Sequence, residues 1–269
     1  MIFSAMHWEL HMYMKCGMLV DAQYVHDELH LKSVVSWSAL IAGYTESGKC
    51  KEALNCFQRM RDEGLFPDSV TFTYALRACR DMRDIEMGKE IHNEICNKGL
   101  LQKQSFLGTA LVDMYSKCGQ LGKARELLKE LPLRNVDSWN VVISEYVKQG
   151  QNLEALNLYE WMQDEGFSPN AVTFICALNA CASIGAMGKG KQIHHEMVSK
   201  GLIGNNTYLD TVLMDINTVH AKHGQDKEGL SCHKKMFKEV LFPSINNLTS
   251  NLKPICVVDN GKETHGGIV

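Results

Sequence analysis

Apolar residues recur at helical spacing between Val34 and Asp68 and divide this stretch into two short helices. In each half they fall mostly three or four positions apart, which predicts one apolar face per helix. These residues are Trp37, Leu40, Ile41 and Tyr44 in the first helix, and Ala53, Leu54, Phe57 and Met60 in the second. Gly48 is expected to end the first helix, and Pro67 lies where the second must have ended. Neither helix can bury its face alone, so the unit must pack against neighbours.

A second copy of this unit lies 102 residues further along, at 136–170. Its side chains match the first copy one by one, including the turn glycine and the closing proline. The matched pairs include Trp37 and Trp139, Ile41 and Ile143, Tyr44 and Tyr146, Gly48 and Gly150, Ala53 and Ala155, Met60 and Met162, and Pro67 and Pro169. Repetition on this scale indicates an array of similar helical pairs, each packed on its neighbours.

The rest of the sequence up to residue 206 follows the same 102-residue period. A 31-residue unit at 3–33 has its copy at 105–135, where MYMKCG matches MYSKCG. A 36-residue unit at 69–104 has its copy at 171–206. Units of 31, 35 and 36 residues therefore alternate along the chain. We expect helix pairs to break at Gly48, Gly119 and Gly150, with no β-sheet.

The regular pattern ends after residue 206. The stretch 207–244 begins like the 31-residue unit and ends like the 35-residue unit, but it is too short to hold both. We interpret it as a degenerate repeat made by fusion of the two, which predicts looser packing there. Residues 245–269 show no repeat and are predicted to form a disordered tail.

The composition limits the partners that the chain can have. Its net charge of −3 argues against general polyanion binding, because non-specific affinity for nucleic acid comes mainly from clustered Lys and Arg. Any nucleic-acid contact must therefore come from a local groove, and DNA is not an expected partner. No apolar run approaches the roughly 18 residues of a membrane span, so no membrane partner is expected either. The first arginine is Arg59, and no transit peptide is visible.

Ten cysteines and eleven histidines raise the question of a metal site. The sequence has no CxxC pair, and its cysteines recur at equivalent positions of the repeats, so buried thiols are the better interpretation. HxE occurs at His26, His92 and His194, but zinc deaminases also need the missing CxxC. We expect no cofactor, no metal and no catalytic residue. A further group of possible metal ligands lies in the degenerate repeat, and we interpret its members as substitutions in that repeat. They are His220, His223, Cys232 and His233.

Several motifs resemble those of one known family, and the resemblance covers 3–244. They are MYSKCG at 114–119, SWNVVISEY at 138–146, GFSPN at 166–170 and ALNACASIGAMGKGKQIH at 177–194. With the alternating unit lengths, they resemble the S, P and L motifs of plant pentatricopeptide-repeat proteins of the PLS class. The chain is expected to lack the C-terminal E and DYW region of that class. The resemblance implies an all-α fold, a right-handed superhelical α-solenoid of helix-turn-helix repeats.

The same resemblance implies the unit types and their role. Units 3–33 and 105–135 are S-type, 34–68 and 136–170 are P-type, and 69–104 and 171–206 are L-type. Members of the family bind single-stranded RNA in a mitochondrion or chloroplast, one base per repeat, with the RNA running 5′ to 3′ along the array. RNA modification such as C-to-U editing, or RNA processing, is therefore the implied role. Because no catalytic machinery is encoded, a deaminase or accessory protein would act in trans.

In the family, the fifth and last residues of a repeat recognise the edge of the base, and we call them the reader pair. Ser38 with Asp68 resembles a guanine reader pair, Thr109 with Asn135 an adenine pair, and Asn140 with Asn170 a pyrimidine pair. The second residue of a repeat inserts between bases and is called the wedge residue. The apolar wedge candidates are Val35, Val70, Phe106 and Val172.

Three features favour a different class of function. Asp137 stands at a wedge position, where a carboxylate should weaken stacking and repel phosphate. The net charge is negative and one repeat is degenerate. The alternative is therefore a solenoid that binds only protein, or a decayed fragment of such an array without an RNA target. Base preference in a randomised RNA pool would separate these alternatives.

Overall fold

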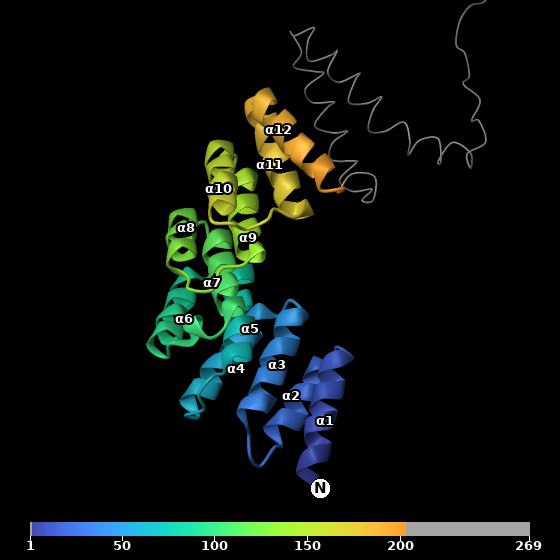
Figure 1. The fold of residues 1–269 in the computed structure, drawn as a ribbon. Coiled ribbons are helices and arrows are strands. Elements are labelled where there is room, and N and C mark those ends of the chain that lie inside the picture. The colour runs from blue at the N-terminus through green and yellow to red at the C-terminus, as the bar shows by residue number, and fades with distance from the viewer. Residues whose placement is uncertain (1, 203–269) are drawn as a thin grey trace, which may run out of the picture. The chain divides into compact units, whose positions relative to one another are not determined.

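In the computed structural model of the chain, residues 2–202 are described, and they form helices with no strand. The helices are named in Figure 1. Their bounds are α1 Ile2–Lys15, α2 Leu19–Asp27, α3 Val34–Glu46, α4 Cys50–Asp62, α5 Ser69–Met82, α6 Ile85–Asn97, the 3₁₀ turn η1 Leu100–Gln102, α7 Ser105–Lys117, α8 Leu121–Glu130, α9 Val136–Lys148, α10 Asn152–Asp164, α11 Ala171–Ile184 and α12 Met187–Ser199.

The expected breaks fall at the three turn glycines. Gly48, Gly119 and Gly150 all take a left-handed backbone, with φ of 72°, 78° and 74°. At the first of them, the Gly48 N–H donates to the Thr45 carbonyl and the Lys49 N–H to the Tyr44 carbonyl. These two bonds satisfy carbonyl groups that the end of a helix leaves open, and only glycine takes this φ without steric cost.

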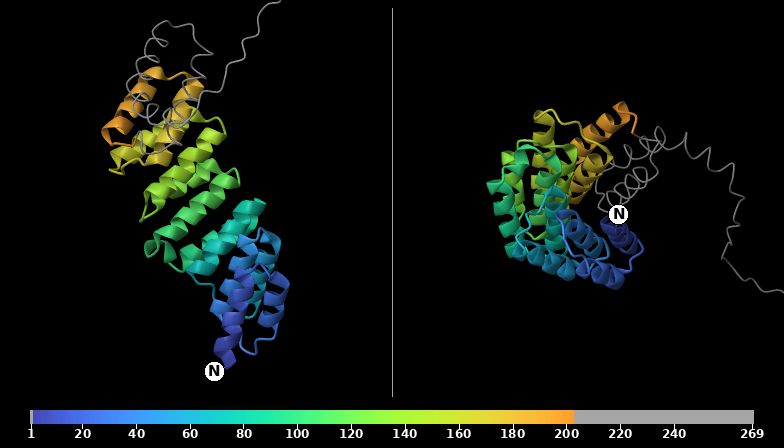
Figure 2. Two further views of the ribbon diagram at one scale, coloured as in Figure 1. Left: turned by 90° about the vertical axis from the view of Figure 1, so that its right-hand side faces the viewer. Right: turned by 90° about the horizontal axis from the view of Figure 1, so that it is seen from below.

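The helices of the first compact unit, residues 1–193, stack in two layers (Figure 1, Figure 2). The odd-numbered helices α1 to α11 form one layer, in which each contacts the next. Each even-numbered helix from α2 to α10 contacts its own odd-numbered partner and the odd-numbered helix that follows. Only neighbouring pairs therefore share a core, which confirms the predicted all-α solenoid of helix-turn-helix repeats.

The core repeats itself with the sequence. Trp37 and Trp139, 102 residues apart, are both fully buried. Phe57 and Phe72 pack with ring centroids 6.2 Å apart, and their counterparts Tyr159 and Phe174 pack at 6.3 Å. In each case the two rings come from a second helix and the first helix of the next unit. These contacts explain how one unit holds the next.

The end of α4 is mostly exposed, but one of its side chains reaches the next helical pair. Arg61 lies 3.8 Å from carboxylate oxygens of Glu90 and Glu94 on α6. The end of α4 is therefore attached to the next helical pair. Trp161 on α10 is half-buried, with its ring edge-on to Trp139 at 4.5 Å.

The proposed degenerate repeat at 207–244 and the proposed tail at 245–269 lie outside the described residues. The histidine and cysteine group within that repeat lies outside them too. The second compact unit begins at His194, and its described part is the end of α12 and the residues up to Leu202.

Candidate nucleic-acid interface

The last residue of each reader pair is the N-cap of the following first helix. Asp68 precedes α5, Asn135 precedes α9 and Asn170 precedes α11. In all three, the side-chain Oδ1 accepts a hydrogen bond from the backbone N–H three residues on, at 2.8, 2.8 and 3.1 Å. Asn and Asp are preferred at this position because they satisfy an amide that the helix leaves open.

Capping also determines which side-chain atom remains for a ligand. Since Oδ1 accepts from the helix, Asn135 and Asn170 keep Nδ2, and Asp68 keeps Oδ2. Among the described residues, Nδ2 of Asn170 and Oδ2 of Asp68 have no hydrogen-bond partner, and both residues are exposed. The amide nitrogen is a donor and the carboxylate oxygen an acceptor. Asn and Asp therefore cap equally well but present opposite polarity.

Two reader pairs are in direct contact. The Thr109 hydroxyl on α7 lies 3.3 Å from Asn135 Oδ1, and it also donates to the Ser105 carbonyl at 3.2 Å. Asn140 Nδ2 on α9 donates to Asn170 Oδ1 at 3.1 Å. The two members of each pair, which are 26 and 30 positions apart in the sequence, therefore meet where one first helix lies beside the next.

The third pair meets through a residue that the sequence analysis did not identify. The Ser38 hydroxyl contacts that of Thr71, and the Thr71 hydroxyl donates to Asp68 Oδ1 at 2.7 Å. Thr173 lies equivalently between Asn140 and Asn170. Both threonines are fully buried. The spacing Asp/Asn-x-x-Thr before an apolar run was the available signal, because it is the signature of a helix N-terminus.

The wedge candidates are exposed apolar side chains in the first turn of the odd-numbered helices. Val35, Val70, Phe106 and Val172 have exposed fractions of 67%, 50%, 45% and 49%. Each is the second residue of its helix. Val70 and Val172 stand two positions after Asp68 and Asn170, the last residues of two reader pairs. Asp137 is the second residue of α9 and is also exposed. Reader and wedge residues therefore lie together at the N-terminal ends of the odd-numbered helices.

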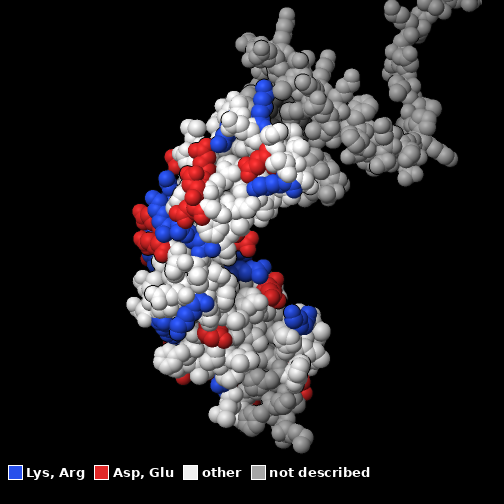
Figure 3. Space-filling model, viewed as in Figure 1, with Lys and Arg blue, Asp and Glu red and all other residues white. Residues whose placement is uncertain are grey.

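Charges of both signs are mixed on the surface. On the face shown in Figure 3, Lys and Arg are interspersed with Asp and Glu, most densely over α6, α8 and α10. Several of these charges are paired between units, as in Arg125 with Glu154 at 3.0 Å and Arg134 with Glu165 at 2.9 Å. Many of the surface charges are thus neutralised by neighbouring units and form no patch of one sign on this face.

The histidines of the HxE sequences serve packing where the structure describes them. The His92 Nδ1 lies 2.9 Å from the Tyr115 hydroxyl, and burial lowers the pKa of His92. Burial likewise lowers the pKa of His194. Within residues 2–202, no three His, Cys, Asp or Glu side chains are grouped to hold a metal ion. The cysteines described there are free thiols, and burial raises the pKa of Cys56 to about 11.

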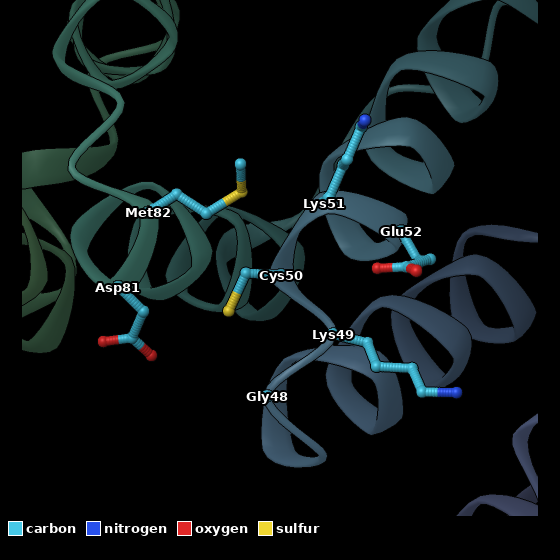
Figure 4. Close-up of a pocket in the computed structure, with 7 residues that line it drawn as sticks. All are labelled: Gly48, Lys49, Cys50, Lys51, Glu52, Asp81 and Met82. Carbon is cyan, nitrogen blue, oxygen red and sulfur yellow. The ribbon is translucent and has the colours of Figure 1, made fainter.

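An open pocket of about 480 Å³ lies at the turn between α3 and α4, beside the end of α5. It is lined by Gly48, Lys49, Cys50, Lys51, Glu52, Asp81 and Met82. Figure 4 shows the two lysine side chains pointing in different directions, and neither points towards Asp81. In a site for a specific ligand, polar groups converge on one point, and the polar groups of this pocket do not.

The chain matches models of the PPR repeat family at residues 32–81 and 134–183, and of the PPR repeat at 109–136 and 172–202. It is 37% identical over 190 residues to pentatricopeptide repeat-containing protein At4g38010 of Arabidopsis thaliana, covering 70% of this chain and 34% of that one. It is also 37% identical to the chloroplastic protein At1g11290 of the same plant, covering 75% and 25%. The chain thus spans about a third or less of these relatives.

Solved structures agree on the fold. The structure of PPR10 in complex with an 18-nt psaJ RNA element gives a TM-score of 0.67 at 17% identity, covering 88% of this chain and 35% of PPR10. Protein-only RNase P 2 of Arabidopsis thaliana gives 0.55 at 13% identity, covering 68% and 41%. At these identities the likeness concerns the fold alone. Within residues 2–202, no helix is long and apolar enough to cross a membrane.

Proposed function

Because the chain belongs to the pentatricopeptide-repeat family, we propose that it binds single-stranded RNA with base preference through its reader pairs. The observation that carries the proposal is the convergence of each pair at the start of an odd-numbered helix, with an exposed wedge position in the same turn. Single-stranded bases offer faces for stacking and unpaired edges for hydrogen bonds, and this arrangement supplies groups for both.

The chemistry of each pair fits the base assigned to it. Asp68 Oδ2 is an acceptor, and the Watson–Crick edge of guanine carries N–H donors. Asn135 Nδ2 is a donor that suits adenine N1, and the Thr109 hydroxyl oxygen can accept from the adenine amino group. Asn140 and Asn170 present amide groups towards a pyrimidine, whose carbonyl oxygen accepts. Unit 34–68 would then select guanine, unit 105–135 adenine and unit 136–170 a pyrimidine, while unit 69–104 would select no base. These bases follow one another 5′ to 3′ along the RNA.

The unit pattern and the relatives support a wider role. The alternation of 31, 35 and 36 residues supports assignment to the PLS class. Relatives carry the names chloroplastic and mitochondrial, which supports a place in one of these organelles. In that setting the chain would select a site on a transcript for modification, such as C-to-U editing, or for processing. A deaminase or accessory protein acting in trans would supply the chemistry.

Selection from a randomised RNA pool tests the proposal. The wild-type chain, at high protein concentration and low salt, should enrich RNAs with guanine three positions upstream of a pyrimidine. Asp68→Asn retains the helix cap but replaces an acceptor with a donor, so it should lose the guanine preference while melting at a similar temperature. Asp84→Asn is the matched control, because Asp84 caps α6 outside any reader pair. Enrichment without preference at either position would contradict the proposal.

A protein-binding solenoid remains the second candidate, favoured by Asp137 at a wedge position and by the net charge of −3. It makes the opposite prediction in the same experiment. A protein-only solenoid retains no RNA from the pool even at low salt, where nucleic-acid binding is strongest.

A further inference from the structure

We propose that the buried hydroxyl of Thr173 transmits the identity of Asn170 to Asn140, so that the last residue of the pair affects base choice through the fifth. Thr71 would do the same between Asp68 and Ser38. This inference rests on the proposed function and adds a positioning residue to it. The threonines lie in the unit after the one whose base they would influence, as the third residue of α5 and of α11.

The polarity of the network around Thr173 starts at the helix backbone. Because the Thr173 N–H donates to Asn170 at 3.1 Å, the atom that accepts must be Asn170 Oδ1. The Asn140 atom 3.1 Å from that oxygen must then be a donor, which is Nδ2. The other end of the Asn140 amide, Oδ1, therefore faces the Thr173 hydroxyl at 2.6 Å and accepts its proton. The orientation of Asn140 is thus determined at both ends.

The Thr71 network has the other polarity. A hydroxyl has one proton, and the Thr71 hydroxyl lies 2.7 Å from the Asp68 carboxylate, which only accepts. The proton therefore points to the last residue of the pair. Ser38 must supply any proton shared with Thr71, and it also lies 2.7 Å from the Val34 carbonyl. An aspartate at the last position thus draws the threonine proton away from the fifth residue. With an asparagine at that position, the proton points to the fifth residue.

Serines occupy the same position in two other units, and for Ser138 the described residues show no such contact. Ser36 and Ser138 are the third residues of α3 and α9, and their hydroxyls donate to the carbonyls of their own N-caps at 2.9 and 2.7 Å. Ser138 completes the capping box with Asn135 but does not contact Thr109 within a hydrogen-bond distance. It therefore carries the capping role of the threonine without the contact to the fifth residue, and it serves as the control.

A double-mutant cycle on the full chain tests the inference. The measured quantity is the ratio of the Kd values for two RNAs that differ only by uracil or cytosine at the base assigned to Asn140. Asn170→Asp should change this ratio about fivefold in the wild-type background. In the Thr173→Val background, the same change should alter the ratio only about twofold, because Asn170 then acts only through its own contact with the base.

Two further measurements keep structural effects apart from positioning. Ser138→Ala should lower the melting temperature about as much as Thr173→Val while leaving the uracil-to-cytosine ratio unchanged. In the protein without RNA, Thr173→Val should shift the NMR signals of the Asn140 side-chain amide, and Ser138→Ala should not. An unshifted Asn140 signal in the Thr173→Val protein would overturn the inference without any RNA measurement.

The outcomes separate this inference from the proposed function. A wild-type chain that binds RNA with a purine at this base as tightly as RNA with a pyrimidine would overturn both, because no base preference would exist to transmit. A clear wild-type ratio, with an equal effect of Asn170→Asp in both backgrounds, would support RNA recognition and overturn the role of Thr173. In that case the last residue would act only through its own contact with the base.

Discussion

The imidazole of His26 meets the indole of Trp37 edge-on, with ring centroids 4.2 Å apart. His26 is fully buried, and neither of its ring nitrogens has a hydrogen-bond partner among the described residues. Burial, together with the nearby cations Lys32 and Arg59, lowers the pKa of His26 to about 4 despite the carboxylates Asp27 and Glu63. The equivalent residue 102 positions on is Leu128, which is also fully buried. The site therefore holds neutral histidine in the place of leucine.

His26→Leu should remove a pH dependence of stability. The folded state keeps the pKa of His26 near 4, below the ordinary 6.5, so its contribution is fully present above pH 6.5 and lost as pH falls through 4. Between pH 7 and pH 5 the wild type should lose about 2 kcal/mol of unfolding free energy from this group, and the variant none of it. Urea unfolding at both pH values measures the difference. His30→Gln, at an exposed site, should keep the wild-type loss.

The two buried tryptophans should respond differently to replacement by phenylalanine. The Trp37 indole N–H donates to Glu63 at 3.2 Å, whereas the Trp139 indole N–H has no partner among the described residues. Near Trp139, the equivalent carboxylate of Glu165 accepts from Trp161 at 3.0 Å instead.

Trp37→Phe therefore loses packing and a hydrogen bond, while Trp139→Phe loses similar packing and removes a buried, unpartnered donor. The free energy of unfolding should fall by about 1–2 kcal/mol more for Trp37→Phe than for Trp139→Phe. Chemical denaturation of both variants measures the difference. Equal losses would mean that Trp139 has a partner in solution.

Gly88 on α6 should not tolerate a methyl group. A Cβ built there would lie 2.5 Å from the sulfur of Met114 on α7, and Met114 is itself fully buried. Gly88→Ala should therefore destabilise the chain by about 1 kcal/mol or more, despite the better helix propensity of alanine. Gly122→Ala is the control, since nothing lies within 4 Å of a Cβ at that helical position. It should be neutral or slightly stabilising, and thermal melting compares the two.

The architecture was predictable because it depends on features that repeat. Apolar spacing and a glycine after each stripe located the helix breaks, and the 102-residue offset placed Trp37 and Trp139 in equivalent cores. Contacts that depend on a single substitution were not predictable in this way. His26 in the place of Leu128 puts an imidazole without a hydrogen-bond partner among the described residues into the core, and Trp161 in the place of Arg59 donates to Glu165; the repeat itself would indicate neither.

The reader pairs came from the resemblance, and the sequence alone did not show that their members meet. Their contact depends on the packing of one odd-numbered helix against the next, which brings Asn140 to Asn170. The capping role of Asn170 was visible as Asn-x-x-Thr ahead of an apolar run, but the shared Thr173 hydroxyl was not. Thr173 belongs to unit 171–206 but contacts the reader pair of unit 136–170, so comparing the units one at a time does not reveal this contact.

Asp137→Val should strengthen RNA binding if the wedge positions contact bases. Asp137 and Val35 occupy equivalent positions 102 residues apart, and both are exposed in the first turn of their helices. A carboxylate there repels phosphate and presents a solvated charge to the face of a base, whereas valine offers apolar contact. The expected gain is roughly 1 kcal/mol, the lower end of stacking energies per base.

The reciprocal change provides the control for this prediction. Val35→Asp should weaken binding by a similar amount, while neither variant alters the melting temperature strongly, because both side chains are exposed. Gel-shift titrations at two salt concentrations separate the two causes. If the carboxylate acts only by repelling phosphate, the advantage of Asp137→Val shrinks at high salt; if it acts by preventing stacking, the advantage persists. Identical affinities of Asp137→Val and wild type at both salts would show that this position does not contact RNA.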